Sequence, residues 1–400
     1  MKRTYAIFLL AALLLALAAG CGGNTSAPTA APTEAPAAAP APATEAPAPA
    51  TEAPATTEEP APETPAPSGT RTVTDVLGRE VEIPAEVTSV GALGSATRTI
   101  AYAGGIDKVT GTTEMEIRGD AGMPFAYACH EHLKDCTAIA SGGSGNTYYD
   151  EAIAELSPDV IIINTNNADT CNDFQAKFNI PVVAIYADKF TSPNLTDSIR
   201  LCGEVLGTEA HAEAVIAAIQ GWLAELDGLT KDIPDAGKPG VYLGAVSFSG
   251  GHGFCGTYCN YAPLIAIHAN NLADSLGEKG GVEIAMEQVI EWDPDIIFLN
   301  PGNMNLVMDD YAVNPDAIDS LRAVQNGSVY SQVNFNYYST NMELAIVDAY
   351  YAGSVIYPEA FRDVDFRAKA EEIFNVMIGR DYLGVLEENG LTFGPITIGE

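Results

Sequence analysis

Residues 151–164, EAIAELSPDVIIIN, predict a helix, a stop and a buried strand in that order. Apolar residues at helical spacing come first, and the proline then ends the helix because it cannot continue one. The apolar run that follows suits a strand buried on both faces of a parallel sheet. Residues 287–300, EQVIEWDPDIIFLN, repeat the pattern. The sequence therefore predicts two similar α/β lobes with a cleft between them.

The composition is that of a large and strongly acidic protein. Its 400 residues are 47% hydrophobic, which suffices for two domains with sizeable cores. The chain has 19 Lys and Arg residues against 53 Asp and Glu residues. Nucleic-acid phosphates are bound by clustered Lys and Arg side chains, so we expect no nucleic-acid partner.

The amino terminus has the features of an export signal. Residues 1–20 combine Lys2 and Arg3 with a short apolar run and small residues at the end, as signal peptides do. The small residues before Cys21 resemble a bacterial lipobox, in which the cysteine is acylated; an ordinary secretory signal with an incidental cysteine is the alternative. Residues 21–69 are rich in Pro, Ala, Thr and Glu and predict a disordered tether. We expect an extracytoplasmic protein held at the cell membrane by its lipid anchor.

The rest of the chain divides into lobes and connections. The predicted parts are an N-terminal lobe at 70–193, an inter-lobe helix at 194–232, a C-terminal lobe at 233–363, and a C-terminal helix and tail at 364–400. The inter-lobe helical pattern is interrupted at Gly207. Residues 71–84 predict a β-hairpin, and the Gly-rich stretch 119–146 is expected to be irregular.

Loops that follow the carboxyl ends of strands should line the cleft, because open α/β sheets bind ligands there. Tyr337 and Tyr338 are the leading candidates, since phenol rings stack on flat ligands and ligate ferric iron when deprotonated; one of the two is expected to point into the core. His252 lies in a Gly-rich loop and could bind a metal or a chelate, or it could be bonded to the backbone. The predicted ligand-binding residues are Ser95, Met115, Arg118, Ser144, Asn164, Tyr186, Ser249, His252, Asn300, Tyr337 and Tyr338.

Six cysteines remain after Cys21, and an even number in an exported chain indicates disulfides. The expected pairs are Cys129–Cys136, Cys255–Cys259 and Cys171–Cys202. The alternative for the first region is a metal cluster, because the run Cys129-His130-Glu131-His132 has ligands at short spacing.

Four features together resemble one family. They are TDVLGREVEIP at 74–84, EAIAELSPDVII at 151–162, the long inter-lobe helix, and EQVIEWDPDIIFL at 287–299. Together they resemble the class III substrate-binding lipoproteins of ABC transporters, which deliver iron-siderophores, haem, cobalamin and related metal chelates. The resemblance implies an α/β fold of two lobes with mainly parallel sheets joined by one rigid helix. It also implies a monomer with its ligand in a shallow cleft, no cofactor and no catalytic residues.

The resemblance also implies partners. Glu151 and Glu287, which begin the two copies of the repeat, resemble the family's carboxylate pair that docks onto arginines of the membrane permease. Two acidic groups held apart by a rigid body would recognise a complementary basic pair and fix its orientation. The alternative is that each is a first-turn glutamate favoured by the helix dipole. The expected partners are therefore the permease with its ATPase, and a metal chelate.

Two other functions compete with chelate binding. A receptor for a bare divalent metal would need several converging His and carboxylate ligands. An enzyme on the same lobes would need a recognisable site, but the sequence has no G-x-S-x-G turn and no P-loop, and only His252 with Cys255 suggests a nucleophile. The scarcity of basic residues favours a neutral chelate, haem or a corrinoid over a polyanion, with Arg98 and Arg118 as the obvious basic candidates.

Overall fold

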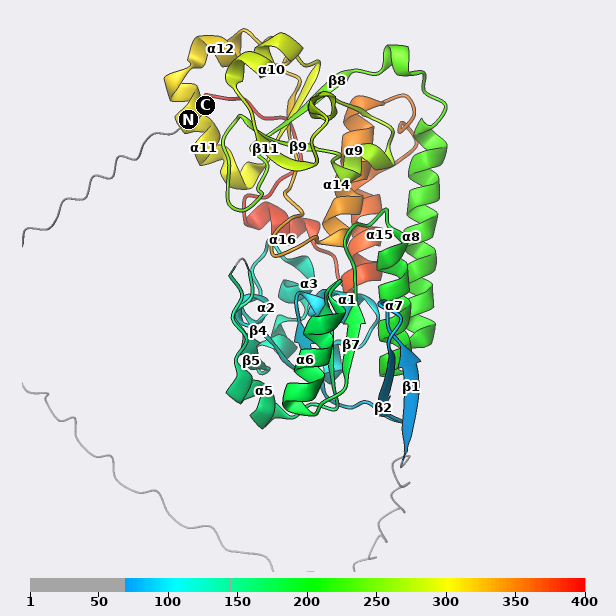
Figure 1. Ribbon diagram of the computed structural model, residues 1–400. Helices are drawn as coiled ribbons and strands as arrows, with labels where there is room; N and C mark the ends of the chain where they lie inside the picture. The colour runs from blue at the N-terminus through cyan, green and yellow to red at the C-terminus, as the bar shows by residue number, and fades with distance from the viewer. Residues whose placement is uncertain (1–68, 144, 400) are drawn as a thin grey trace, which may run out of the picture. The chain divides into compact units, whose positions relative to one another are not determined.

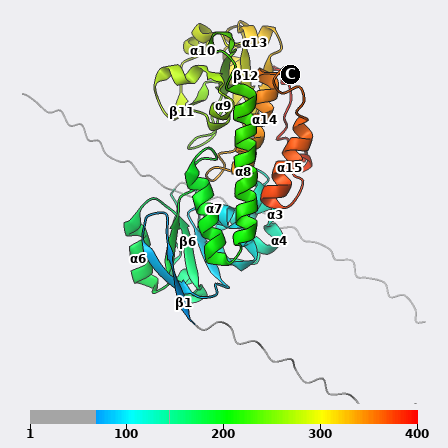
Figure 2. The same ribbon diagram turned by 90° about the vertical axis from the view of Figure 1, so that its right-hand side faces the viewer.

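Both copies of the repeated pattern form a helix and a strand in the computed structural model, which describes residues 69–143 and 145–399 (Figure 1 for the helices, Figure 2 for the strands). The two units are α5 (Asp150–Leu156) with β6 (Val160–Asn164), and α10 (Met286–Trp292) with β12 (Ile296–Leu299). Each helix ends at a residue in the left-handed region, Ser157 or Asp293, both with φ of 42°. The proline that follows prevents the helix from resuming.

The aspartate of each Pro-Asp pair holds the start of the neighbouring strand. Oδ2 of Asp159 accepts hydrogen bonds from the backbone N–H groups of Thr88 and Ser89, at 2.8 and 3.0 Å. Oδ2 of Asp295 accepts one from the backbone N–H of Gly240, at 2.8 Å. The repeat in the sequence is therefore a structural repeat, in which the same residue has the same role in each lobe.

The N-terminal lobe is built on a five-stranded parallel sheet in the order β5-β4-β3-β6-β7. Its other strands are β5 (Thr137–Ala140), β4 (Val109–Thr113), β3 (Val90–Leu93) and β7 (Val182–Ile185), and the lobe begins with the hairpin β1 (Thr70–Thr74) and β2 (Glu80–Pro84). Its helices are α1 (Ala96–Tyr102), η1 (Ile106–Lys108), α2 (Glu114–Arg118), α3 (Pro124–Ala128), α4 (His130–Leu133), α6 (Ala168–Phe178) and α7 (Pro193–Leu206). Helices α5 and α6 pack on one face of the sheet, and α1, α3 and α7 contribute to the core on the other.

The C-terminal lobe has a four-stranded parallel sheet in the order β10-β8-β12-β13 and a separate antiparallel pair, β9 with β11. The strands are β8 (Gly240–Gly244), β9 (Gly256–Cys259), β10 (Asn270–Asn271), β11 (Gly280–Glu283) and β13 (Val329–Ser331). The helical segments are η2 (Asp235–Gly237), α9 (Ala262–Ala266), η3 (Leu272–Leu276), η4 (Pro301–Asn303), α11 (Met304–Val313), α12 (Pro315–Asp319) and α13 (Arg322–Gln325).

The predicted inter-lobe helix at 194–232 is two helices. Gly207, with φ of 70°, ends α7, and α8 (Glu209–Thr230) starts directly after the turn. Figure 2 shows α8 running from one lobe to the other with α7 packed alongside it. Sequence periodicity continues across the glycine, but the left-handed residue reverses the chain.

Helix α8 does not connect the lobes alone. Helix α14 (Met342–Ile356) is buried along nearly its whole length, and α15 (Phe366–Ile378) packs against α14, α8, α1 and α3. One hydrophobic core runs through these helices and includes residues of both sheets, such as Ile162 and Leu243. A connection of several packed helices resists bending, because close-packed interiors transmit strain.

The predicted fold class is confirmed: the chain forms two α/β lobes with parallel sheets, joined by a long helix. The stretch 119–146 is more regular than expected, because α3, α4 and β5 lie within it, and the predicted tail includes α16 (Leu383–Glu388). The signal peptide, Cys21, almost all of the tether, and Ser144 lie outside the described residues. Within the described ranges, none of the helices combines the length and apolar character that crossing a bilayer requires.

Candidate functional site

A cleft of about 1430 Å³ is lined by loops from both lobes. The loops follow the carboxyl ends of strands such as β3, β6, β8 and β12, which is where parallel sheets are expected to bind ligands. The predicted residues that line it are Ser95, Met115, Arg118, Asn164, Tyr186, Ser249, Asn300, Tyr337 and Tyr338. The structure thus brings them together, while their ligand-binding role stays a prediction.

His252 does not line the cleft. Its ring stacks on Phe248 with the ring centroids 3.7 Å apart. Its Nδ1 lies 2.8 Å from Oε2 of Glu283, and its Nε2 lies 2.9 Å from the backbone oxygen of Phe248. Both ring nitrogens therefore have protein partners, which fits the alternative of a locally bonded loop histidine. Phe248 is the member of this pair that faces the cleft.

The cleft lining is mostly polar and carries few charged side chains. Hydroxyl, amide and glycine positions dominate its lining, and Arg118 is the one cationic side chain among the described residues that form it. Nε of Arg118 lies 3.4 Å from the Asp120 carboxylate, which partly neutralises it. Glu114 and Asp188 add two carboxylates to the lining. A ligand of high negative charge would find little compensation here.

Arg98, the second basic candidate, lies beneath the cleft rather than in it. Its side chain is 3% exposed, and its guanidinium donates to the backbone oxygen of Tyr338 at 2.7 Å and to Oδ1 of Asn341 at 3.2 Å. It also lies 4.7 Å from the ring centroid of Phe125. Arg98 is in the N-terminal lobe and these oxygens are in the loop before α14, so Arg98 links the loop that carries Tyr337 and Tyr338 to the other lobe.

Two buried carboxyl groups lie within the electrostatic influence of Arg98. Oε2 of Glu116 accepts hydrogen bonds from the Thr112 and Thr113 hydroxyls, at 2.6 and 2.8 Å. Glu343 accepts a hydrogen bond from the Tyr102 hydroxyl. Burial raises the pKa of both carboxyls, and the Arg98 charge opposes that rise. This layer is a buried hydrogen-bonded support for the cleft floor.

Tyr337 and Tyr338 differ in environment, as expected. Tyr337 is 36% exposed, and its hydroxyl donates to the Asp120 carboxylate at 3.0 Å. Tyr338 is partly buried against the main core. Burial raises the pKa of both phenols, and the Asp120 and Glu116 carboxylates add to the rise. Both hydroxyls are therefore protonated at neutral pH, so a ferric ion would have to displace a proton to be bound by either.

The cleft loops hold several non-glycine residues in the left-handed backbone region. They are Ser95 at φ 68°, Ser249 at 52°, Tyr338 at 49° and Ser339 at 68°. Such residues cost about 1–3 kcal/mol each and tend to cluster at functional sites. The left-handed residues in these loops therefore support the cleft as the functional site.

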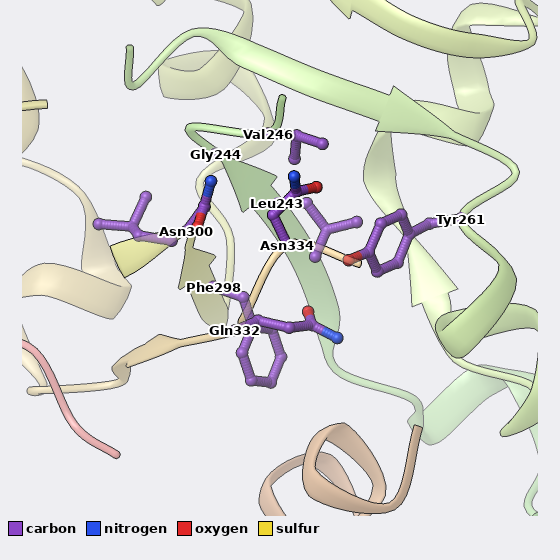
Figure 3. A pocket seen from close by; sticks show the side chains of 9 residues that line it. Leu243, Gly244, Val246, Tyr261, Phe298, Asn300, Gln332 and Asn334 are labelled. Carbon is purple, nitrogen blue, oxygen red and sulfur yellow. The ribbon is translucent and has the colours of Figure 1, made fainter. Parts of the chain in front are cut away.

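A small cavity of about 10 Å³ adjoins the cleft in the C-terminal lobe (Figure 3). Asn300 and Asn334 line both spaces. The Gln332 side chain also lines the cavity; it is 4% exposed, and neither its oxygen nor its nitrogen has a hydrogen-bond partner among the described residues. The cavity is otherwise lined mainly by apolar side chains, and its size is about that of one water molecule.

All six cysteines in the described chain are free thiols, which contradicts the three predicted disulfides. Cys171 and Cys202 pack in separate cores on opposite faces of the N-terminal sheet. Cys136 Sγ donates to the backbone oxygen of Val109, and Cys259 Sγ to that of Ala273, so neither thiol is directed at its predicted partner, Cys129 or Cys255. An even cysteine count does not show which side chains face each other.

The described residues give little support to the two alternative functions, an enzyme and a receptor for a bare metal ion. Burial, with nearby carboxylates, raises the pKa of the Cys255 thiol to about 11, so it is protonated and a poor nucleophile at neutral pH. Across residues 69–143 and 145–399, no group of three or more His, Cys, Asp or Glu side chains could hold a metal ion.

Sequence reasoning missed part of the lining. Asn146, Tyr148, Asp188, Asn303 and Leu391 line the cleft but were not nominated. Asp188 and Asn303 lie two and three residues beyond nominated positions, so wider loop windows would have included them. Leu391 comes from the loop after α16, and nothing in the sequence indicates that this segment returns to the cleft.

Comparison with known proteins places the chain beside solute receptors. The family model described as Periplasmic binding protein matches residues 106–332. The Fe(3+)-citrate-binding protein YfmC of Bacillus subtilis is 23% identical over 208 residues, which span 49% of this chain and 59% of that protein.

Solved structures share the fold over most of the chain. A periplasmic solute binding protein of Veillonella parvula is 20% identical with a TM-score of 0.66, covering 81% of this chain and 97% of that one. The molybdate periplasmic binding protein MolA of Haemophilus influenzae is 20% identical with a TM-score of 0.61, covering 78% and 99%. At these identities the likeness concerns the fold alone.

Proposed function

Because the chain belongs to the periplasmic binding protein family, we propose that it is the solute-binding component of an ABC importer. It captures a metal chelate in the cleft between its lobes and delivers it to a membrane permease. The observation that supports this most is the cleft itself, which is lined from both lobes at the carboxyl ends of their strands. Its volume of about 1430 Å³ suits a solute larger than a bare ion.

The lining favours an uncharged chelate with flat and polar surfaces. Tyr186, Phe248 and Tyr337 offer aromatic rings, and most other groups in the lining are hydroxyls, amides and backbone. Neutral iron-siderophores and corrinoids match this chemistry, and haem would rely on Arg118 for its carboxylates. Ferric citrate, the ligand in the name of the Bacillus subtilis relative, is an anion and fits a cleft with one arginine less well.

Delivery to a permease rests on the two repeated glutamates. Glu151 and Glu287 are both exposed, each in the first turn of its helix, α5 or α10. They therefore offer one carboxylate on each lobe, held apart by the packed helices that join the lobes. Electrostatic complementarity of this kind fixes orientation and raises association rates. Anchoring through an acylated Cys21 would keep the receptor near the permease.

The proposed role is binding without catalysis. The candidate nucleophile Cys255 has a raised pKa, and His252 has both nitrogens bonded, so no activated pair is formed. Native mass spectrometry of the purified protein with ferrichrome, cyanocobalamin, haem, ferric citrate, zinc and manganese tests the proposal. One chelate bound per protein molecule supports it. Binding of zinc or manganese alone would favour the bare-metal alternative, and turnover of a chelate would favour an enzyme.

A further inference from the structure

Each lobe presents one serine hydroxyl to the cleft from the same place in its fold. Ser95 follows β3 and Ser247 follows β8, the first strand in each parallel sheet, and both residues line the cleft. Each serine is bonded to the asparagine that closes a repeat. Nδ2 of Asn164 donates to Oγ of Ser95 at 3.2 Å, and Nδ2 of Asn300 donates to Oγ of Ser247 at 3.4 Å.

The backbone fixes the direction of these amides. The N–H of Ala187 donates to Oδ1 of Asn164 at 3.2 Å, and the N–H of Gly302 donates to Oδ1 of Asn300 at 3.0 Å. A backbone N–H requires an acceptor, so the amide oxygen must face it and the amide nitrogen must face the serine. Flipping either asparagine would set an NH₂ group against a backbone N–H, two donors facing each other.

The serine oxygens are therefore acceptors toward the protein. A hydroxyl has two lone pairs and one hydrogen to donate. Oγ of Ser247 receives a second amide bond, from Nδ2 of Asn303 at 2.9 Å, which occupies its remaining lone pair. Among residues 69–143 and 145–399, neither Ser95 nor Ser247 donates its hydroxyl hydrogen to a protein acceptor. Each hydroxyl thus retains a hydrogen to donate, and both residues line the cleft, Ser95 with only 4% of its surface exposed.

Ser95 does not form the capping hydrogen bond that is usual for a serine at the start of a helix. It stands at the N-cap of α1, where a serine side chain usually bonds a free N–H of the first turn, yet it makes no such bond. Its φ of 68° lies in the left-handed region, which is costly for a serine. The preceding Gly94 permits this path, because a Cβ there would lie 2.6 Å from the backbone oxygen of Asn164. Helix α1 therefore begins without a side-chain cap and Ser95 has a strained backbone, while Ser95 remains a lining residue of the cleft.

We propose that Ser95 and Ser247 are a matched pair of donor subsites, each binding a hydrogen-bond-accepting oxygen on opposite sides of one solute. This rests on the proposed function, that the cleft binds a chelate. The serine pair specifies an uncharged chelate with carbonyl-type oxygens on its rim, such as a ferric hydroxamate or an amide-bearing corrinoid. Hydroxyl donors suit these oxygens, whereas a rim of hydrocarbon would leave both hydrogens without a partner.

Titration of ferrichrome and cyanocobalamin into the wild-type protein and serine variants tests the pair. Ser95→Ala and Ser247→Ala should each raise Kd by about three- to tenfold, the usual effect of losing one neutral hydrogen bond. The double variant should approach the product of the two effects, since the serines lie in separate lobes. Ser247→Thr keeps the hydroxyl and should bind with a Kd close to that of the wild type. Ser275→Ala removes a hydroxyl that bonds Leu272 outside the cleft and should leave Kd unchanged.

The binding data distinguish failure of the serine pair from failure of chelate binding as such. Unchanged Kd values in both alanine variants, with tight binding by the wild type, would overturn the donor pair and leave the chelate receptor standing. If neither chelate binds the wild type, the proposed function fails for these solutes, and a crystal structure of the empty protein decides the inference. It should show an acceptor water about 2.8 Å from each serine oxygen; a serine hydroxyl directed at a protein carbonyl would contradict the pair.

Discussion

The Tyr337 hydroxyl of the C-terminal lobe donates a 3.0 Å hydrogen bond to the Asp120 carboxylate of the N-terminal lobe. Both residues lie beside the cleft, and the Tyr337 ring also covers Gly122, where a Cβ would be 3.2 Å from the ring. The contact therefore joins the lobes near the cleft. It is partly exposed, so its contribution is modest and its loss should affect opening more than folding.

Tyr337→Phe should loosen this contact without unfolding the protein. Loss of one hydrogen bond of about 1 kcal/mol should speed backbone amide exchange in the segment Asp120–Met123 by about fivefold. Tyr311→Phe is the matched control, because its hydroxyl bonds the Asp319 carboxylate within one lobe. Hydrogen-exchange mass spectrometry measures both. Equal exchange in that segment for wild type and Tyr337→Phe would show that the bond does not hold the lobes.

Arg98→Met should destabilise the whole fold. The change leaves the backbone oxygen of Tyr338 and Oδ1 of Asn341 without their donor and removes the buried charge near two carboxyls, and such a loss costs about 3–5 kcal/mol. Arg200→Met removes an exposed arginine that bonds Glu213 and Asp197, and should cost less than about 1 kcal/mol. Urea unfolding compares the two. A loss of similar size in both variants would refute the support role of Arg98.

Asp348 should make the protein less stable as pH rises. It is fully buried in α14, both its oxygens lack partners among the described residues, and burial raises its pKa well above the ordinary value. Above the ordinary Asp value of about 3.9, the folded state binds more protons at this site than the unfolded state. The stability that protonation gives is present at low pH and is lost as pH rises toward the folded pKa.

Asp348→Asn should remove that dependence. The variant should gain stability over wild type as pH increases, by at most about 1.4 kcal/mol per pH unit. Asp232→Asn, at an exposed position, should track wild type. Thermal unfolding from acid to mildly alkaline pH gives the comparison, and parallel curves for wild type and Asp348→Asn would contradict the prediction.

Glu151→Lys and Glu287→Lys should impair uptake but not solute binding. Each reverses a carboxylate proposed to dock on the permease, so transport in cells should fall at least about tenfold while Kd stays the same. Glu155→Lys and Glu291→Lys make the same charge change on exposed positions of the same helices and serve as controls. Equal transport by all four variants would mean that Glu151 and Glu287 do not dock on the permease and are simply favoured in the first turn by the helix dipole.

The sequence predicted the fold well where local chemistry sets it. Proline and apolar runs determined where α5 and α10 stop and where β6 and β12 begin, because both constraints act within a few residues. The turn at Gly207 was visible as an interruption, but the packing of α7 along α8 depends on contacts far apart in the chain. The disulfide pairs failed for the same reason, since the sequence does not reveal that Cys171 and Cys202 lie on opposite faces of a sheet.

The site was predictable to the extent that it follows strand ends. Asn164 and Asn300 could be nominated because the repeat places each at the end of a buried strand. Arg98 and His252 were candidates of the right type in nearby segments, yet one lies beneath the cleft and the other is bonded to Glu283. Side-chain direction, unlike strand position, is decided by tertiary packing.

The central claim is that the cleft binds an uncharged metal chelate. Isothermal titration of the protein with ferrichrome and cyanocobalamin, and with ferric citrate as the anionic comparison, tests it most directly. We predict saturable binding of a neutral chelate at one per protein molecule, weakened by Tyr337→Ala. Its Kd should be nearly unchanged by added salt, because an uncharged solute has no net charge for salt to screen. Tight, salt-sensitive binding of ferric citrate, with no binding of either neutral chelate, would contradict it.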